Sequence, residues 1–234
     1  MARITRKELK TDKFALEVGQ TVTFFEEHQK AVIRYGGAAL AIIVVAFLYW
    51  TYHQHQQSAR EAVLAKAIQL QETVVSTQPS QNGATTFPTQ EIKNQATTKA
   101  FGDLSRQYPG TAEGEVAQYY LGAIKADEGK LAEAEKYFLD VAQKGGDRYA
   151  ALAKLSLAQI YFSDGRDSQG EKTLRDLMAH PTVFVSSEQA ALTLARYLMI
   201  KNPAEARKLL DPLRNRQGAV GQTALTLYGE LPPQ

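Results

Sequence analysis

One stretch of this sequence limits what the chain can fold into more than any other: residues 35–52 contain no charged side chain. These eighteen residues read YGGAALAIIVVAFLYWTY. As a helix they would be about 27 Å long, close to the thickness of the hydrocarbon core of a bilayer. Trp50 and Tyr52 stand at one end, and Lys30 and Arg34 precede the other, as expected at two membrane interfaces. We predict a single transmembrane helix over residues 35–52.

The flanking charges give this predicted helix a direction. Residues 1–34 hold seven Lys and Arg against five Asp and Glu, whereas the chain after Tyr52 holds twenty of each. Cytoplasmic flanks of membrane helices are enriched in Lys and Arg. We therefore expect a single-pass protein of the bacterial inner (cytoplasmic) membrane, with residues 1–34 as a cytoplasmic arm and the C-terminal domain in the periplasm. An arm of this length favours an uncleaved anchor over a signal peptide, whose cationic region is short.

The arm itself supports two interpretations. After a predicted helix start at Thr11, Phe14, Val18, Val22 and Phe25 recur near helical spacing. On the first interpretation, they form the apolar side of an amphipathic helix that lies on the inner leaflet. On the second, the arm is a short helix that packs on nothing, because a glycine and two threonines weaken it.

The chain after the span predicts a helix pair of irregular form. Residues 53–75 continue the helical pattern out of the bilayer, and a second helix follows from residue 91. Between them, residues 76–90 concentrate Ser, Thr, Gln, Pro, Gly and Asn, which is typical of a loop. This loop is either an insertion, since surface insertions cost little free energy, or a partner-binding element centred on Phe87. We expect residues 53–108 to form a helix pair that the loop at 76–90 divides.

Further along, the sequence repeats itself with a period of thirty-six residues. Leu121 and Leu157 are separated by this distance, and so are Gly129 and Gly165, which we place in tight turns that need positive φ. Each glycine precedes a second helix, in which small residues let the helices approach and large ones fill the gap. The predicted fold is all-α: a transmembrane helix followed by an α-solenoid. Its repeats are expected at residues 115–146, 151–182 and 187–214, within a repeat region 109–216 that a capping helix and tail at 217–234 would close.

The residues of these repeats resemble the tetratricopeptide repeat (TPR). Leu-Gly or Leu-Ala in the first helix, a turn glycine, and Ala134 and Phe138 in the second helix follow that motif. Gly170 stands where the motif has alanine, and Lys125 where it has the aromatic residue that Tyr161 supplies in the next repeat. The whole layout also resembles the YfgM-like ancillary subunits of the SecYEG translocon. That resemblance implies a periplasm-facing scaffold whose protein partners are translocon subunits, periplasmic chaperones or client segments.

Stacked helix pairs curve so that their first helices line a concave groove, and the repeat register predicts which side chains face it. Because this set is mostly apolar, we expect it to bind a hydrophobic or amphipathic segment of another protein. The alternative is that these side chains pack against a neighbouring helix or the long loop. The predicted partner-binding residues are Tyr119, Ala123, Leu155, Gln159, Phe162, Leu192, Arg196 and Met199.

Catalytic signals are missing from the sequence. The chain has no cysteine, and it has no phosphate loop or dinucleotide-binding glycine pattern. His53 and His55 are two residues apart and diverge on a helix, while His180 stands at a predicted helix end, where it would meet the last carbonyls. A net charge of +2 does not suggest a nucleic-acid partner. We expect no enzyme, cofactor, metal or small-molecule substrate, and the alternative to a scaffold is a single-pass envelope signalling or regulatory protein whose repeats sense a partner.

Overall fold

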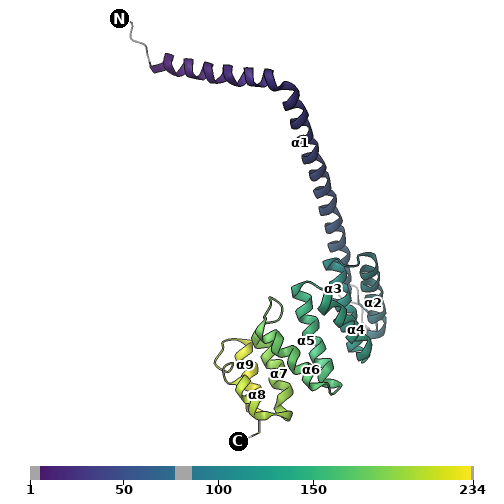
Figure 1. Cartoon of the computed structure of the whole chain (residues 1–234). Helices are drawn as coiled ribbons and strands as arrows, with labels where there is room; N and C mark the ends of the chain where they lie inside the picture. Colours follow the sequence, from purple (N-terminus) through teal and green to yellow (C-terminus); the bar gives the residue numbers. More distant parts are fainter. Residues whose placement is uncertain (1–5, 77–85, 233–234) are drawn as a thin grey trace. The chain divides into compact units, whose positions relative to one another are not determined.

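The computed structural model of the chain describes residues 6–76 and 86–232 (Figure 1). Every regular element in these residues is an α-helix, and one isolated β-bridge joins Val75 to Phe87. The predicted all-α class is therefore confirmed. The helices are α1 (Arg6–Glu72), α2 (Gln90–Gln107), α3 (Ala112–Asp127), α4 (Leu131–Lys144), α5 (Asp147–Ser163), α6 (Asp167–Ala179), α7 (Ser187–Lys201), α8 (Pro203–Leu210) and α9 (Ala219–Gly229).

Helix α1 contains the apolar stretch. It begins at Arg6, upstream of the predicted start at Thr11, because the residues between them are good helix formers. From Ile33 to Trp50 every residue is exposed, and the large apolar side chains are 47% to 72% accessible. By length and composition, α1 is long and apolar enough to cross a membrane. The predicted amphipathic pattern of the arm falls on side chains outside the described residues.

The chain divides into two compact units between Ala59 and Arg60. The second unit begins with the last turns of α1, in which Ala67 is buried among side chains of α2 and α3. Arg60 also forms an ion pair of 3.2 Å with Glu113 near the start of α3, and both side chains are largely buried. These contacts fix the end of α1 in the first layer of the helical unit.

Both ends of the predicted loop at 76–90 are held together. The amide of Ser76 donates to the carbonyl of Phe87 at 2.9 Å, and the amide of Phe87 donates to the carbonyl of Val74 at 3.1 Å. Phe87 is half-buried in this bridge. The two hydrogen bonds thus hold the start and the end of this loop together.

After α2 the chain forms three helix pairs, α3–α4, α5–α6 and α7–α8, and then α9. In the first two pairs the turn glycines Gly129 and Gly165 have φ of 75° and 73°, which confirms the predicted positive φ. The amides that follow them donate back to the carbonyls of Lys125 and Tyr161, which closes each first helix. The predicted stripe is buried, in the second helices at Ala134, Phe138, Val141, Gly170, Leu174, Leu177, Ala206 and Leu210, and just after α8 at Leu213.

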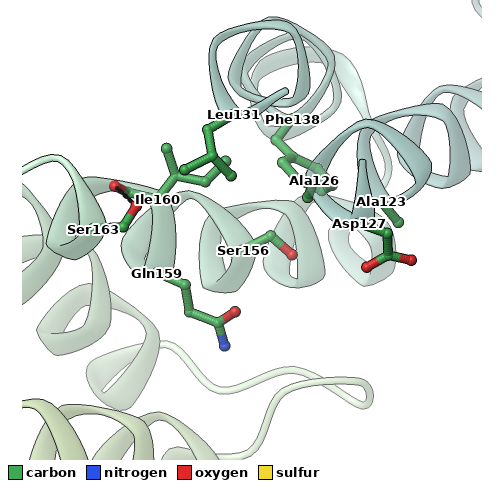
Figure 2. A pocket seen from close by; sticks show the side chains of 9 residues that line it. All are labelled: Ala123, Ala126, Asp127, Leu131, Phe138, Ser156, Gln159, Ile160 and Ser163. Carbon is green, nitrogen blue, oxygen red and sulfur yellow. Dashed lines mark hydrogen bonds between the residues drawn. The ribbon is translucent and has the colours of Figure 1, made fainter. Parts of the chain in front are cut away.

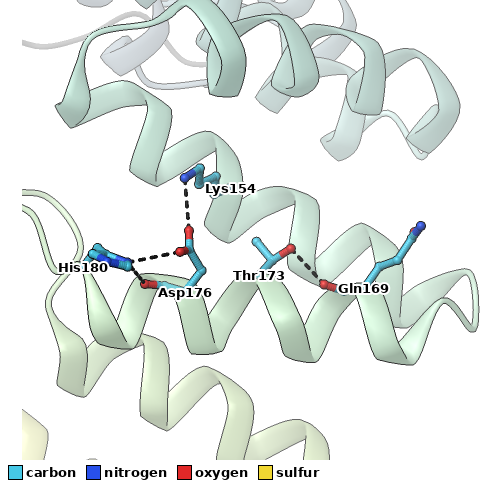
Figure 3. Close-up of polar contacts among 5 residues, drawn as sticks. All are labelled: Lys154, Gln169, Thr173, Asp176 and His180. Atoms are coloured by element: carbon cyan, nitrogen blue, oxygen red, sulfur yellow. Dashed lines mark hydrogen bonds and ion pairs between the residues drawn. The ribbon is translucent and has the colours of Figure 1, made fainter.

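A polar contact joins the two helices of the second pair (Figure 3). Lys154 Nζ on α5 lies 3.2 Å from Asp176 Oδ2 on α6. The ring of His180 lies 3.1 Å from the same carboxylate and 3.2 Å from the carbonyl of Asp176, so it meets a last-turn carbonyl as predicted. The contact with Lys154 is the main cause that lowers the pKa of Asp176, and the contact with His180 lowers it further.

Candidate partner-binding surface

One repeat position recurs in the first helices of the three pairs. Ala123, Gln159 and Arg196 occupy this position in α3, α5 and α7. Each of them lines one of two hollows: Ala123 and Gln159 line a hollow between α3 and α5, and Arg196 lines a hollow between α7 and α9. These three predicted residues therefore line two separate hollows, and the continuous groove stays a prediction.

The α3–α5 hollow has a volume of about 310 Å³. Leu131 and Phe138 of α4 form its apolar side (Figure 2). Gln159 on α5 and Asp127 at the end of α3 lie on the opposite side and point away from these apolar residues. The hollow therefore combines an apolar floor with an exposed polar rim, and its charged lining group is a carboxylate.

The α7–α9 hollow is larger, at about 400 Å³. Its apolar lining comes from Leu192 on α7 and Val220 on α9, both half-buried. Its charged lining group is the exposed guanidinium of Arg196. Within residues 6–76 and 86–232 this guanidinium has no hydrogen bond or ion pair. The second hollow thus offers free cationic donors beside an apolar surface.

The remaining predicted residues lie mainly in the packing between helices. Leu155 is 9% exposed and belongs to the largest apolar cluster, on which Met199 also packs. The ring of Phe162 stacks on that of Tyr197 with centroids 3.7 Å apart. Tyr119 is half-buried against the core. Leu155 is buried and the other three side chains are half-buried, and all four take part in packing or ring contacts.

A row of aromatic rings on the same helices was not anticipated from the sequence. Tyr119 on α3 contacts Tyr149 on α5 with ring centroids 5.4 Å apart, and Tyr149 contacts Phe184 in the α6–α7 loop at 5.5 Å. Phe184 is 38% exposed and its neighbour Val183 is 86% exposed. Tyr119 and Tyr149 are thirty residues apart, which differs from the repeat period, so periodicity could not have paired them. Burial is the main cause that raises the pKa of the Tyr119 and Tyr149 hydroxyl groups, and it favours their neutral form.

In the part of the chain that the structure describes, no three His, Asp or Glu side chains lie close enough together to hold a metal ion. Two of the hydroxyl groups that line the α7–α9 hollow, those of Ser186 and Thr193, are engaged with backbone. Ser186 accepts from the amide of Gln189 at 3.1 Å, and Thr193 donates to the carbonyl of Gln189 at 2.9 Å. The surface is therefore suited to contacts with another chain through Arg196 and the apolar lining.

Comparison with known proteins gives one match. A family model described as a tetratricopeptide repeat-like domain matches residues 23–212, which include the apolar stretch of α1 and all helices from α2 to α8. Helix α9 lies beyond the matched residues. No curated protein and no solved structure matches the chain.

Proposed function

The chain belongs to the tetratricopeptide repeat-like domain family, and from this premise we propose that it is a membrane-anchored scaffold whose repeats bind other proteins. The observation that carries the anchor is the exposure of every residue from Ile33 to Trp50. So large a continuous apolar surface is unfavourable in water. In a bilayer the helix satisfies its own backbone hydrogen bonds, and its side chains contact lipid. Lipid is therefore the first partner that we assign.

The proposed location is the bacterial inner membrane, with the arm in the cytoplasm and the repeats in the periplasm. The excess of Lys and Arg before the apolar stretch supports this orientation. The natural chain has no cysteine, so single cysteines report topology without a background. We expect a membrane-impermeant maleimide added to spheroplasts to label Gln217→Cys and to spare Ala2→Cys. The opposite labelling pattern would place the repeats in the cytoplasm and overturn this orientation.

The proposed role of the repeats is to hold a hydrophobic or amphipathic segment of a protein partner. The apolar floors of the two hollows support this role. On the family resemblance, the partners are translocon subunits, periplasmic chaperones or their clients, and the scaffold catalyses no reaction. A photo-crosslinking residue at Gln159 or Gln189, on the hollows, should capture such a partner in membranes. The same residue at the exposed Lys172 of the second-helix layer is the control.

Two results of this crosslinking would contradict the scaffold. Equal capture from Lys172 and from the hollows would mean that the first-helix face is not the binding surface. Capture of a cytoplasmic regulator by the same photo-crosslinking residue placed on the arm, with none from the repeats, would favour a signalling protein instead.

A further inference from the structure

The α7–α9 hollow differs from its counterpart in charge. Arg196 in this hollow and Gln159 in the α3–α5 hollow occupy the same repeat position, so a guanidinium stands where the earlier repeat has an amide. In the α3–α5 hollow the charged lining residue is Asp127. The two hollows therefore carry lining charges of opposite sign.

The walls of the α7–α9 hollow hold no acidic side chain that neutralises Arg196. Glu188 is the sole acidic residue of α7, and it pairs with Arg216 at 3.1 Å. Helix α9 contains no acidic residue within Ala219–Gly229. An exposed guanidinium beside an apolar surface binds a carboxylate through two parallel hydrogen bonds. The charge that complements this hollow is thus one carboxylate.

The apolar lining of the hollow determines which side chain of the ligand fits beside the carboxylate. Leu192 precedes Arg196 by one helical turn on α7, and Val220 lies across the hollow on α9. A ligand that places a carboxylate on Arg196 brings its neighbouring side chain between Leu192 and Val220. An aliphatic side chain fits this position because both residues are half-buried and apolar.

We propose that the α7–α9 hollow binds an internal segment of a partner protein in which an Asp or Glu stands beside an aliphatic residue. This inference rests on the proposed scaffold role and specifies the chemistry of its partner. A side-chain carboxylate is assigned rather than a C-terminal one, and the blocked peptides of the test separate the two sources. Helix α9 forms one wall of this hollow and lies outside the residues matched by the family model.

The test uses the full chain in lipid nanodiscs and a phage-displayed library of random peptides of about twelve residues, long enough to cross the hollow at roughly 3.3 Å per residue. We expect the natural chain to enrich peptides with an Asp or Glu beside an aliphatic residue. The best of them is then synthesised with an acetylated N-terminus and an amidated C-terminus. Replacing its acidic residue by the amide should weaken binding about tenfold, the size expected of a charge-assisted hydrogen bond.

Three variants locate the effect. Arg196→Gln should remove the preference for the acidic peptide, and Arg196→Glu should enrich Lys or Arg at the same peptide position. Arg196 has no partner among the described residues, so neither change should disturb folding. Lys208→Gln removes an equally exposed cation from the second helix of the same repeat and should behave as the natural chain.

The failures of the two proposals are distinguishable. Peptides enriched without an acidic residue, or equally by Arg196→Gln, would overturn the carboxylate inference while supporting a peptide-binding scaffold. Binding of the synthesised peptide only when its C-terminus is left free, instead of amidated, would overturn the internal segment. No enrichment of any peptide by any variant would overturn the scaffold function itself.

Discussion

In both repeats, α3–α4 and α5–α6, side chains of similar total volume fill the space between the two helices. The larger and the smaller side chain, however, stand at different positions in the two repeats. In the first repeat Gly122 on α3 faces the buried ring of Phe138 on α4. A Cβ atom added to Gly122 would lie 2.8 Å from Phe138 Cε1. In the second repeat Ala158 and Leu174 occupy the equivalent positions and are fully buried. A larger residue in one helix is thus matched by a smaller one across from it.

At a second pair of positions, the large ring is on the first helix of the repeat and the glycine is on the second. The ring of Phe162 on α5 lies against Gly170 on α6, where a Cβ atom would overlap it. In the first repeat Ala126 and Ala134 stand at these two positions. The glycine that departs from the tetratricopeptide pattern is therefore explained by the ring beside it. Close-packed interiors conserve local volume more strictly than residue identity.

The largest expected effect comes from breaking the first match. Gly122→Ala should lower the free energy of unfolding by about 2 kcal/mol, because the added Cβ atom would lie 2.8 to 3.2 Å from three ring atoms of Phe138, which is 2% exposed and packs in the core. Urea denaturation of the full chain in detergent, followed by far-ultraviolet circular dichroism, measures this loss. Hydrogen exchange should place it in α3 and α4.

A second substitution, in Phe138, should partly restore the stability that Gly122→Ala removes. Gly122→Ala combined with Phe138→Leu recreates the alanine and leucine of the second repeat. The double variant should be more stable than the sum of the single changes predicts, with a coupling of about 1 kcal/mol. Strict additivity would show that the two positions do not share volume.

A smaller loss is expected from Gly170→Ala, about 1.5 kcal/mol, although its Cβ atom would lie nearer to the opposing ring. Phe162 is half-buried, so its ring has more freedom to shift than that of Phe138, but the stack on Tyr197 resists this movement. Thermal melting monitored by circular dichroism tests the ranking. Phe162→Ala in the Gly170→Ala background recreates the alanine pair of the first repeat and should recover part of the loss. A greater loss than that of Gly122→Ala would reverse the comparison.

The sequence predicted the features that depend on period and local conformation. The apolar stretch, the helix pairs, the turn glycines and the buried stripe of the second helices all follow from spacing. Gly170 could only be identified as a departure, because its explanation is Phe162 on the other helix of the pair. Spacing cannot show which side chain fills a given gap.

The candidate surface was predicted less completely for a related reason. The register correctly places Gln159 and Arg196 on the first helices, but their neighbours decide what remains accessible. Leu155 shares that register, but it is 9% exposed and belongs to the largest apolar cluster. Asp127 and the wall formed by α9 come from a helix end and from a helix outside the repeats. No periodic pattern marks such residues.

Where the two repeats agree, the same change should have the same effect in both. Gly129→Ala and Gly165→Ala should each lower the free energy of unfolding by about 1 kcal/mol, because φ near +74° strains an alanine. Asparagine tolerates this conformation better, so Gly129→Asn and Gly165→Asn serve as matched controls with smaller losses. Urea midpoints of the four variants provide the measurement. Clearly unequal alanine effects would mean that the two turns differ beyond their shared geometry.

The smallest expected effect lies in the polar contacts, where the repeats differ again. Asp176 joins α6 to Lys154 of α5, whereas Asp140, its equivalent, pairs with Lys144 inside α4. Asp176→Asn should cost about 0.5 kcal/mol at neutral pH, and Asp140→Asn about 0.3 kcal/mol, as for exposed ion pairs and helix pairs.

The pH dependence of stability tests whether the contribution of Asp176 comes from its contact with Lys154. Lys154 holds the pKa of Asp176 below its usual range, so the contribution of this carboxylate is fully present above an ordinary aspartate pKa of about 3.9. It is lost as the pH falls through the lowered pKa of the folded state. Urea midpoints of the natural chain and Asp176→Asn should therefore differ at pH 7 and converge toward pH 3. Lys154→Gln should remove most of that difference, since His180 is the weaker of the two influences on Asp176. A pH-dependent difference that persists in Lys154→Gln would mean that the contact between the helices is not its source.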